Sequence, residues 1–411
     1  MKTLRVDLLG ESVGILEQTP TGRIEFRYTK DWLQRAGAHP LSQSLPLEDR
    51  VFEERECVGF FGGLLPEEHN REIIARNLGI SARNDFAMLR EIGGECAGAV
   101  SLIEEDAWEV SRAQDYQSVS EAELINLLDQ LPQRPLLAGK EEVRLSLAGA
   151  QNKLALYRSE KGFALPLNES PSTHILKPEI ERFPNLVESE AYCLRLAGAC
   201  GLPASRAESV CFGKHRCLLV ERYDRRVDAD GNILRLHQED FCQAHGIPSR
   251  IKYQNEGGPS LSDCFDLVRR AASAPGRDLI HLFNAVVLNY LIGNNDAHGK
   301  NFSLLYREVG GGRVVELAPF YDLVSTAIYP ELSPKMAMKI GGQYLPEKLR
   351  RNDWERLWEE IGFSQKQARK QTLQFAEVVE GNSGKPANET EAAIGRLIHK
   401  RIQGLSALLQ R

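Results

Sequence analysis

Apolar and polar positions alternate in the first part of the chain, a pattern that predicts strands separated by short turns. The first three such runs are bounded by a glycine or by the turn Thr-Pro-Thr-Gly at 19–22: Leu4–Leu9, Val13–Glu17 and Gly22–Tyr28. Two helical patterns follow, at 66–78 and 85–91, and Gly79 is the predicted end of the first. Another strand is predicted at 99–103, so we expect this part to be rich in β-structure.

The next helical pattern marks the end of this β-rich part. It covers Ser118–Leu131 and begins with the capping pattern Ser120-x-x-Glu123. Pro132 and Pro135 cannot continue the helix. We therefore place a domain boundary near residue 135.

The apolar period changes again along the rest of the chain. Residues 143–225 consist mostly of strand patterns with one helix. Helical patterns dominate from about residue 262: Leu261–Ala272, Asp278–Ile292, Trp354–Ile361, Gln365–Val379 and Glu391–Leu409. These patterns predict an α+β fold with a β-rich accessory subdomain (1–135), a β-rich lobe (136–235) and a helical lobe (236–411).

Composition narrows the functional class. The 51 Lys and Arg residues against 57 Asp and Glu residues give a net charge of −6, which argues against a strongly basic nucleic-acid binder. The 8 cysteines show neither CxxC spacing nor a zinc-ligand pattern. The N-terminal segment has no apolar signal core, and the strongest apolar run, 285–293, is too short to span a membrane. We expect a cytoplasmic protein with reduced thiols.

The richest polar segment follows the apolar helical pattern that ends at Ile292. Asp296 and Asn301 have the Asp-x-x-x-x-Asn spacing of a kinase catalytic loop, in which the Asp accepts the substrate hydroxyl and the Asn binds Mg²⁺. A polar helix end followed by a turn, with Gly293 and Asn294 in the cap, is the structural alternative.

A second acidic residue follows at the end of the strand pattern 313–317. Asp322 comes after Phe320 and Tyr321, where a second magnesium ligand is needed. Alternatively, Asp322 is the N-cap of a helix over 323–327.

Two upstream features match the phosphate-binding half of a kinase. Lys177 ends an apolar strand, as does the lysine that pairs with the α- and β-phosphates, although a solvent-facing lysine fits the same pattern. Ala148, Gly149 and Ala150 form a small-residue turn that lets backbone N–H groups approach phosphates. The turn is neither a Walker A loop nor a GxGxxG motif. The order of loop, lysine, Asp-x4-Asn and Asp nevertheless favours a kinase.

The chain resembles the HipA family, the kinase toxins of bacterial type II toxin–antitoxin modules, from about residue 3 to beyond 340. The resemblance is carried by these segments: 146–153 (SLAGAQNK), 173–177 (THILK), 220–226 (VERYDRR), 238–243 (QEDFCQ), 292–303 (IGNNDAHGKNFS) and 319–325 (PFYDLVS). It implies a protein-kinase-like two-lobe fold with an N-terminal accessory subdomain, and ATP and Mg²⁺ as cofactors.

The resemblance also assigns roles to individual residues. Asp296 becomes the catalytic base, Lys177 the phosphate lysine, and Asn301 and Asp322 the Mg²⁺ ligands. The remaining nucleotide-binding residues are these: Ala148, Gly149, Ala150, Gln151, Asn152, Lys153, Glu221, Arg222, Tyr223, His298, Lys300 and Tyr321. We add Glu190 as a partner of Lys177, although Glu188 and a solvated helix face explain the pattern equally well.

The resemblance implies that Ser146 is autophosphorylated, which expels the loop and inactivates the kinase; a solvent-facing serine is the alternative. Two departures from the family are Asn152, where relatives often have Glu, and the pair Asn294-Asn295. Neither removes a charged catalytic group.

The resemblance further implies a protein substrate in translation, typically an aminoacyl-tRNA synthetase, and growth arrest as the result. The implied partner is a HipB-like helix-turn-helix antitoxin, with operator DNA reached through the complex. We expect any DNA contact of this chain to involve a C-terminal group of basic residues: Lys348, Arg350, Arg351, Lys366, Arg369 and Lys370. The competing hypotheses are a catalytically silent corepressor and a kinase for a small hydroxylated metabolite.

Overall fold

The computed structural model describes residues 2–104, 114–140, 143–310 and 312–410. The chain forms two compact units, each built from separate segments. Unit 1 comprises Met1–Pro178, Val210–Arg250 and Leu305–Val314, and unit 2 comprises Glu179–Ser209, Ile251–Leu304 and Val315–Arg411. The boundaries predicted near 135 and 235 both fall inside unit 1. One apolar core there contains buried side chains from both sides of residue 135, from Leu4 to Leu219.

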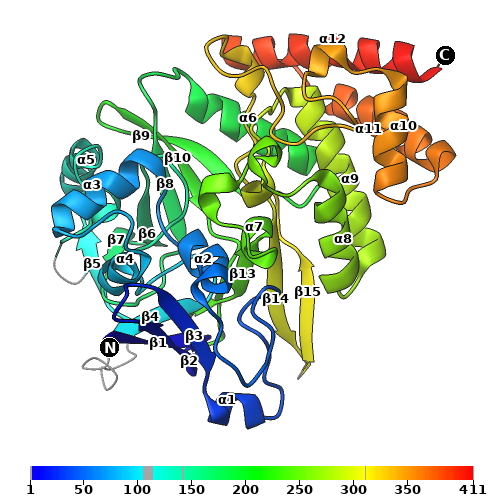
Figure 1. Cartoon of the computed structure of the whole chain (residues 1–411). Coiled ribbons are helices and arrows are strands. Elements are labelled where there is room, and N and C mark those ends of the chain that lie inside the picture. Colours follow the sequence, from blue (N-terminus) through cyan, green and yellow to red (C-terminus); the bar gives the residue numbers. More distant parts are fainter. Residues whose placement is uncertain (1, 105–113, 141–142, 311, 411) are drawn as a thin grey trace. The chain divides into compact units, whose positions relative to one another are not determined.

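The first sheet of unit 1 is antiparallel, with strand order β3-β2-β1-β4 (Figure 1). Its strands are β1 (Lys2–Leu8), β2 (Glu11–Gln18), β3 (Ile24–Tyr28) and β4 (Val100–Glu104). Leu4, Val6 and Leu8 are buried, as the alternating pattern predicts. The accompanying helices are α1 (Lys30–Gln34), α2 (Glu54–Gly63), α3 (Glu68–Leu78) and α4 (Asp85–Ile92). Gly79 caps α3 in the left-handed conformation, so the predicted helix end is confirmed.

The second sheet of unit 1 holds the predicted phosphate lysine. Its strand order is β5-β7-β6-β8-β10-β9. The strands are β5 (Tyr116–Val119), β6 (Leu154–Ser159), β7 (Gly162–Pro166), β8 (His174–Pro178), β9 (Ala207–Phe212) and β10 (His215–Glu221). Other elements of this unit are α5 (Glu121–Gln130), β11 (Arg225–Val227), β12 (Ile233–Arg235), β13 (His237–Asp240) and α7 (Phe241–Ala244). The capping box Ser120–Glu123 at the start of α5 is confirmed.

Unit 2 is mainly helical, as predicted for this part of the chain. Its helices are α6 (Leu186–Ala199), α8 (Leu261–Ala271), α9 (Pro275–Ile292), α10 (Arg351–Glu360), α11 (Gln365–Asn382) and α12 (Glu389–Gln410). α8, α11 and α12 all pack against α9, the most apolar of them. The hairpin β14 (Ser303–Val309) and β15 (Gly312–Leu317) begins and ends in unit 2. Short 3-10 turns occur in both units, at Pro135–Leu137, Ser249–Ile251, Gln254–Glu256, Gly299–Asn301, Thr326–Ile328 and Pro346–Lys348.

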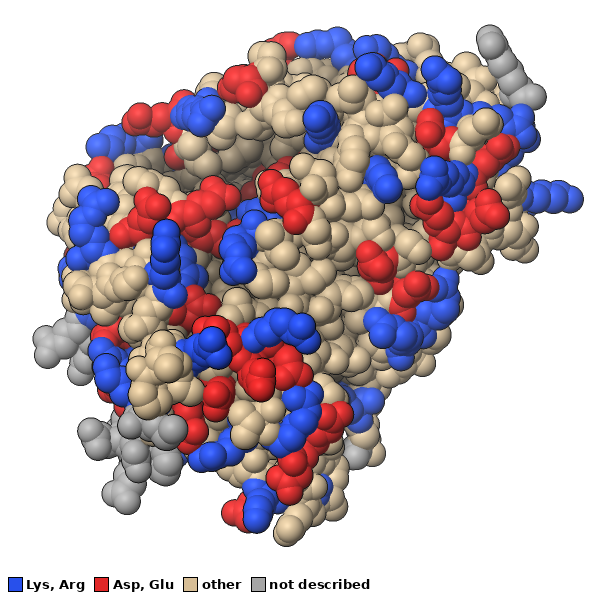
Figure 2. Space-filling model, viewed as in Figure 1, with Lys and Arg blue, Asp and Glu red and all other residues tan. Residues whose placement is uncertain are grey.

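The surface carries charges of both signs. On the face drawn in Figure 2, basic and acidic side chains are intermixed, with no broad area of one sign. Among the described residues, no helix is both long and apolar enough to cross a membrane.

Candidate active site

The catalytic-loop candidate in unit 2 begins where α9 ends. Gly293 caps α9 with φ 76°, and a Cβ there would lie 2.6 Å from Leu397 Cδ2, so glycine is needed at this turn. The side chain of Thr326 fixes the turn, accepting from the Asn295 N–H (2.8 Å) and donating to the Gly293 carbonyl (3.1 Å). The cap predicted from Gly293 therefore exists, and it directs the chain into a loop with its own internal bonds.

Asp296 is exposed, whereas the polar residues around it in the loop are buried. Its Oδ1 accepts a hydrogen bond from the Tyr253 hydroxyl at 2.8 Å, and its backbone N–H donates to Asn294 Oδ1 at 3.2 Å. The Tyr253 ring also packs edge-on against His298. An exposed, oriented carboxylate can accept a proton from an incoming hydroxyl group.

The two predicted magnesium ligands lie side by side. Asn301 Nδ2 donates to Asp322 Oδ2 at 3.0 Å, although the residues are 21 positions apart. Asn301 Oδ1 accepts from the His298 N–H at 3.1 Å. Asp322 has φ 57°, a left-handed conformation that is rare for a non-glycine residue and concentrates at functional sites.

These two side chains fit a magnesium ion. Mg²⁺ takes one or two oxygen ligands from protein and the others from phosphate and water. The N-cap alternative for Asp322 is wrong, because the next helical turn begins at Thr326 and has Ser325 as its N-cap.

Tyr321 supports the same loop from the following segment. Its hydroxyl donates to the Lys300 carbonyl at 2.6 Å and accepts from Ser303 Oγ at 2.7 Å. Lys300 and His298 are both buried. The side chain of Tyr321 thus contacts the loop that contains Asp296 and Asn301.

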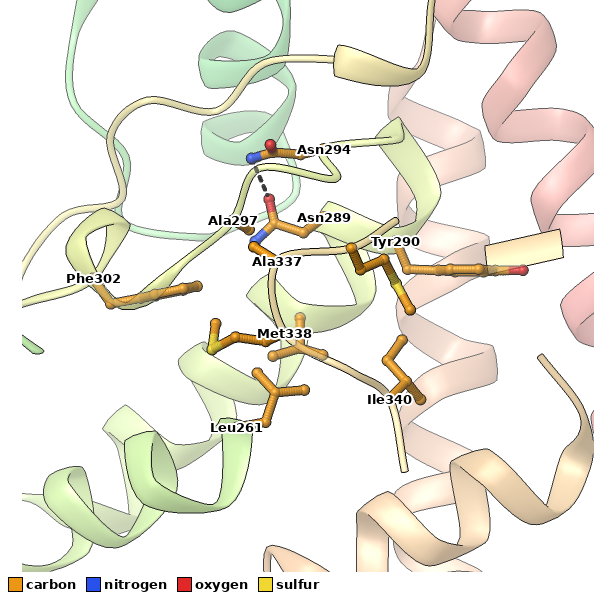
Figure 3. A pocket seen from close by; sticks show the side chains of 11 residues that line it. Leu261, Asn289, Tyr290, Asn294, Ala297, Phe302, Ala337, Met338 and Ile340 are labelled. Carbon is orange, nitrogen blue, oxygen red and sulfur yellow. Dashed lines mark hydrogen bonds between the residues drawn. The ribbon is translucent and has the colours of Figure 1, made fainter. Parts of the chain in front are cut away.

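A pocket in unit 2 lies beside the catalytic loop but does not suit a triphosphate (Figure 3). Its lining includes Asn294, Ala297, Phe302, Met336 and Met338. No charged side chain contributes to its lining. Ala337, which also lines the pocket, donates its N–H to the Asn295 carbonyl of the loop at 2.7 Å. The pocket therefore marks the packing behind the loop and not a nucleotide site.

The nucleotide-loop candidate belongs to unit 1 and precedes β6. Gly149 has φ +104°, and a Cβ there would lie 2.8 Å from Lys153 Nζ. The Lys153 ammonium group donates to the Ala148 carbonyl, which closes the turn. Ala150 is exposed, and Gln151 and Asn152 are partly exposed. The small residues thus leave the loop backbone accessible to a ligand.

Ser146 does not face solvent. Its side chain is completely buried, and its Oγ donates to the Leu64 carbonyl at 2.7 Å. Its backbone N–H donates to the Glu95 carbonyl at 2.9 Å. The solvent-facing alternative is therefore wrong.

Lys177 lies on β8, as predicted for a strand lysine. Its neighbour Leu176 is completely buried, so Lys177, which is partly exposed, points to the opposite face of the strand. Across the sheet, Lys177 pairs with Leu218 of β10. Its predicted partner Glu190 is buried on α6 of unit 2, and this pairing stays a prediction.

The side chains of Glu221, Arg222 and Tyr223, predicted to bind the nucleotide, lie in different surroundings. Glu221 is exposed at the end of β10, and the Tyr223 hydroxyl donates to Gln238 Oε1. Arg222 is buried, and its guanidinium group binds Glu95 at 2.9 Å and Asp224 at 2.8 Å. The side chain of Arg222 is thus part of a structural ion-pair cluster, and its backbone N–H donates to the Thr173 carbonyl at 2.9 Å.

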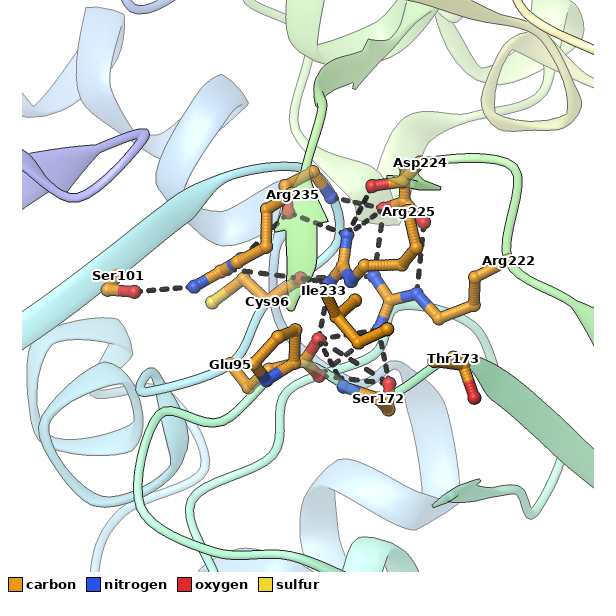
Figure 4. Close-up of polar contacts among 12 residues, drawn as sticks. Glu95, Cys96, Ser101, Ser172, Thr173, Arg222, Asp224, Arg225, Ile233 and Arg235 are labelled. Atoms are coloured by element: carbon orange, nitrogen blue, oxygen red, sulfur yellow. Dashed lines mark hydrogen bonds and ion pairs between the residues drawn. The ribbon is translucent and has the colours of Figure 1, made fainter. Parts of the chain in front are cut away.

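This buried cluster joins two parts of unit 1 that are far apart in the sequence, around residues 95–101 and 222–235 (Figure 4). Arg225 also pairs with both Glu95 and Asp224, and Arg235 donates to Ser101 Oγ at 2.7 Å. Burial alone would raise the pKa of Asp224, but the charges of Arg222 and Arg225 outweigh it and hold that pKa well below its usual range. The pKa of Glu95 is lowered in the same way by the three arginines.

The lowered pKa of Asp224 predicts a pH-dependent contribution to stability. The carboxylate stabilises the fold fully above its unfolded pKa of about 3.9, and this contribution is lost as the pH falls toward the lower folded value. Asp224→Asn should therefore destabilise the protein at pH 7, and the difference from wild type should shrink below about pH 3.9. Urea denaturation of both proteins between pH 7 and pH 3 measures it. A difference that stays constant would contradict the prediction.

Sequence reasoning missed two residues at these sites. Tyr253 precedes Asp296 by 43 positions, and Asn70 donates its Nδ2 hydrogen to the carbonyl of Ala150, 80 positions away, at 2.8 Å. Neither residue lies in a recognisable motif, and neither contact leaves a periodic signal. Only the folded chain reveals them.

Two family models match the chain, the HipA N-terminal domain at residues 4–103 and the HipA-like C-terminal domain at 145–382. The chain belongs to the HipA family. The kinase toxin HipA of Shewanella oneidensis, named as a serine/threonine-protein kinase, is 32% identical over 78% of this chain and 74% of its own length. Y4mE of Sinorhizobium fredii, which carries the name of a kinase, is 46% identical over 88% of this chain and 86% of its own length.

A solved structure agrees with this assignment. The complex of HipA, HipB and operator DNA from Shewanella oneidensis contains a chain that matches with a TM-score of 0.84 and 28% identity, covering 99% of this chain and 97% of that one. The predicted HipA-like fold class is therefore confirmed. The relatives support kinase activity, which implies the use of ATP.

Proposed function

We propose that this HipA-family chain is an ATP-dependent protein serine/threonine kinase and the toxin of a toxin–antitoxin module. The observation that carries the proposal is the arrangement in unit 2. The exposed carboxylate of Asp296 is oriented by Tyr253, and the amide of Asn301 contacts the strained Asp322. Such an arrangement provides a proton acceptor and a pair of hard ligands, the groups that phosphoryl transfer requires.

In the proposed reaction, a serine or threonine hydroxyl of the substrate attacks the γ-phosphorus of ATP. A new phosphorus–oxygen bond forms, the bond between the γ-phosphorus and the β–γ bridging oxygen breaks, and ADP leaves. Asp296 accepts the hydroxyl proton. Asn301 and Asp322 would hold Mg²⁺, which supplies positive charge to the phosphate oxygens.

The groups of unit 1 are proposed to bind the nucleotide itself. Lys177 neutralises phosphate charge, and the loop 148–153 offers backbone N–H groups to the phosphates. Glu221 and Tyr223 contact the adenine ring in this proposal. Support comes from the partly exposed positions of Lys177 and the loop, and from the family's kinase relatives.

Autophosphorylation of Ser146 is proposed as the mode of self-inactivation. Because Ser146 Oγ is buried and donates to the Leu64 carbonyl, the loop must leave its place before the hydroxyl can react. A dianionic phosphoserine cannot donate that bond and would repel the carbonyl oxygen and the phosphates of ATP. Modification would therefore keep the loop out of its binding conformation.

The proposed partners are a HipB-like helix-turn-helix antitoxin, operator DNA reached through the complex, and a protein substrate in translation, typically an aminoacyl-tRNA synthetase. The cited solved complex with HipB and operator DNA supports the first two. The net charge of −6 and the mixed charges in Figure 2 fit DNA contact through a partner. We propose a cytoplasmic location for this assembly.

The chemical class of the acceptor can be tested directly. The full chain is incubated with Mg²⁺, ATP labelled at the γ-phosphate and a bacterial lysate, which is then separated into protein and small-molecule fractions. We expect the label on serine or threonine of proteins. Label confined to small molecules would indicate a metabolite kinase, and no transfer above a chain-free control would contradict the proposal.

Removing the proposed phosphate lysine should weaken ATP use. We expect Lys177→Met to lower kcat/KM for ATP by about a hundredfold, because a charge-assisted phosphate contact is worth about 1.5–3 kcal/mol in both binding and transfer. Lys161→Met, at an exposed turn, is the matched control and should leave kcat/KM unchanged. Equal values for the two variants would exclude a phosphate-binding role for Lys177.

A further inference from the structure

The nucleotide loop is held from one side by a segment of the N-terminal region. This holding segment, Leu64–Asn70, leads into the first turn of α3. Besides the bond from Ser146 to Leu64, the Glu67 N–H donates to the Gly149 carbonyl at 3.3 Å, and Pro66 forms a parallel bridge with Gly149. Asn70 Nδ2 donates to the Ala150 carbonyl at 2.8 Å. All these residues belong to unit 1.

These contacts fix the direction of two peptide groups. In a planar trans peptide, the carbonyl oxygen and the N–H hydrogen of the next residue point in opposite directions. No cis peptide occurs in the described part of the chain. Because the carbonyls of Gly149 and Ala150 are bound by the holding segment, the N–H groups of Ala150 and Gln151 are directed away from it.

That orientation matters for an anion. A carbonyl oxygen turned toward a phosphate would repel it, whereas an N–H group attracts it. Asn70 supplies the contact to the more exposed of the two peptides, since Ala150 is exposed while Gly149 is partly buried. Asn70 itself is only 7% exposed, so solvent cannot easily replace its amide as the partner of that carbonyl.

We propose that Asn70 is a positioning residue for the nucleotide loop, acting through the Ala150 carbonyl to present backbone N–H groups to the phosphates of ATP. The inference rests on the proposed function, because it takes the loop to be the phosphate-binding element. It gives the N-terminal region an indirect part in ATP binding, through the conformation of the loop.

The chain offers a matched control on the same helix. Asn77 also lies on α3 and donates its Nδ2 hydrogen to a backbone carbonyl, that of Gln133, at 2.9 Å, but it does not contact the loop. We expect Asn70→Ala to raise the Kd for a fluorescent ATP analogue (mant-ATP) about tenfold, while Asn77→Ala changes it less than twofold. In phosphotransfer assays, Asn70→Ala should raise KM for ATP by a similar factor and leave kcat at saturating ATP within about twofold.

Each result of these binding and kinetic measurements either supports or overturns the role of Asn70. If the wild type binds mant-ATP and the two variants have equal Kd values, the proposed role of Asn70 is overturned. A fall in kcat for Asn70→Ala with KM for ATP unchanged would overturn it as well. If Asn70→Ala does not fold, as judged by circular dichroism, Asn70→Leu keeps the side-chain volume without the donor and is held to the same expected shift. Failure of the wild-type chain to bind mant-ATP would instead contradict the proposed function, and this inference with it.

Discussion

Asp296→Asn is expected to lower the rate of phosphoryl transfer by about a thousandfold, within the range that general-base catalysis contributes. Asparagine keeps the size of the side chain and can still accept from the Tyr253 hydroxyl, but its amide cannot take the proton of the acceptor hydroxyl. Because Asp296 is exposed, its replacement should leave the folded structure and the Kd for ATP unchanged. Steady-state kinetics and mant-ATP titration measure the two quantities.

The control for this variant is another aspartate of unit 2. Asp266 is an exposed residue of α8 that pairs with Arg269, and Asp266→Asn should retain the wild-type rate. If Asp296→Asn and Asp266→Asn were equally active, Asp296 would not be the base.

Glu95→Gln should produce the largest loss of stability. Glu95 is completely buried and binds both Arg222 and Arg225, so the change leaves these two buried guanidinium groups to share one carboxylate, that of Asp224. Breaking a buried ion pair from one side costs about 3–5 kcal/mol in the free energy of unfolding. Chemical denaturation with urea at pH 7 measures the loss.

A glutamate on a nearby helix provides the comparison. Glu91 pairs with Arg90 near the surface of unit 1, and Glu91→Gln should cost only about 0–1 kcal/mol. A loss below about 1 kcal/mol for Glu95→Gln would show that the buried cluster does not stabilise the fold as described.

Local patterns predicted much of the fold. The strands β1 and β2, the helix α6 and the ends of α3 and α9 at Gly79 and Gly293 follow from apolar spacing and glycine caps. Such features depend on neighbours in the sequence, and for that reason a single chain reveals them.

The division of the chain into two units, with unit 1 extending to both sides of the boundary predicted near residue 135, could not be predicted in this way. Proline and a helix end mark that point in the sequence, but the apolar core of unit 1 continues across it. A boundary depends on which apolar faces meet, and periodicity does not specify that.

The sequence predicted the chemical types of the candidate site residues, but not the residues that hold them in place. The spacing of Asp296 and Asn301, followed by Asp322, indicated residues with matching chemical roles, and the structure brings Asn301 and Asp322 into contact. The contacts made by Asn70 and Tyr253 join residues far apart in the sequence, and no local pattern encodes them. Arg222 illustrates the converse, because a charged residue in a motif proved to be part of a buried ion-pair cluster.

We propose that the side chains of Asp296, Asn301 and Asp322 together form a phosphoryl-transfer site. Its most direct test is the initial rate of γ-phosphate transfer from ATP to protein serine or threonine, measured with Mg²⁺ for the wild-type chain, Asp296→Asn, Asp322→Asn and Asp266→Asn. We expect transfer by the wild type and Asp266→Asn, and a rate about a thousandfold lower for Asp296→Asn and Asp322→Asn. If Asp296→Asn and Asp322→Asn both transferred phosphate at the wild-type rate, or if the wild type transferred none, the proposed site would be contradicted.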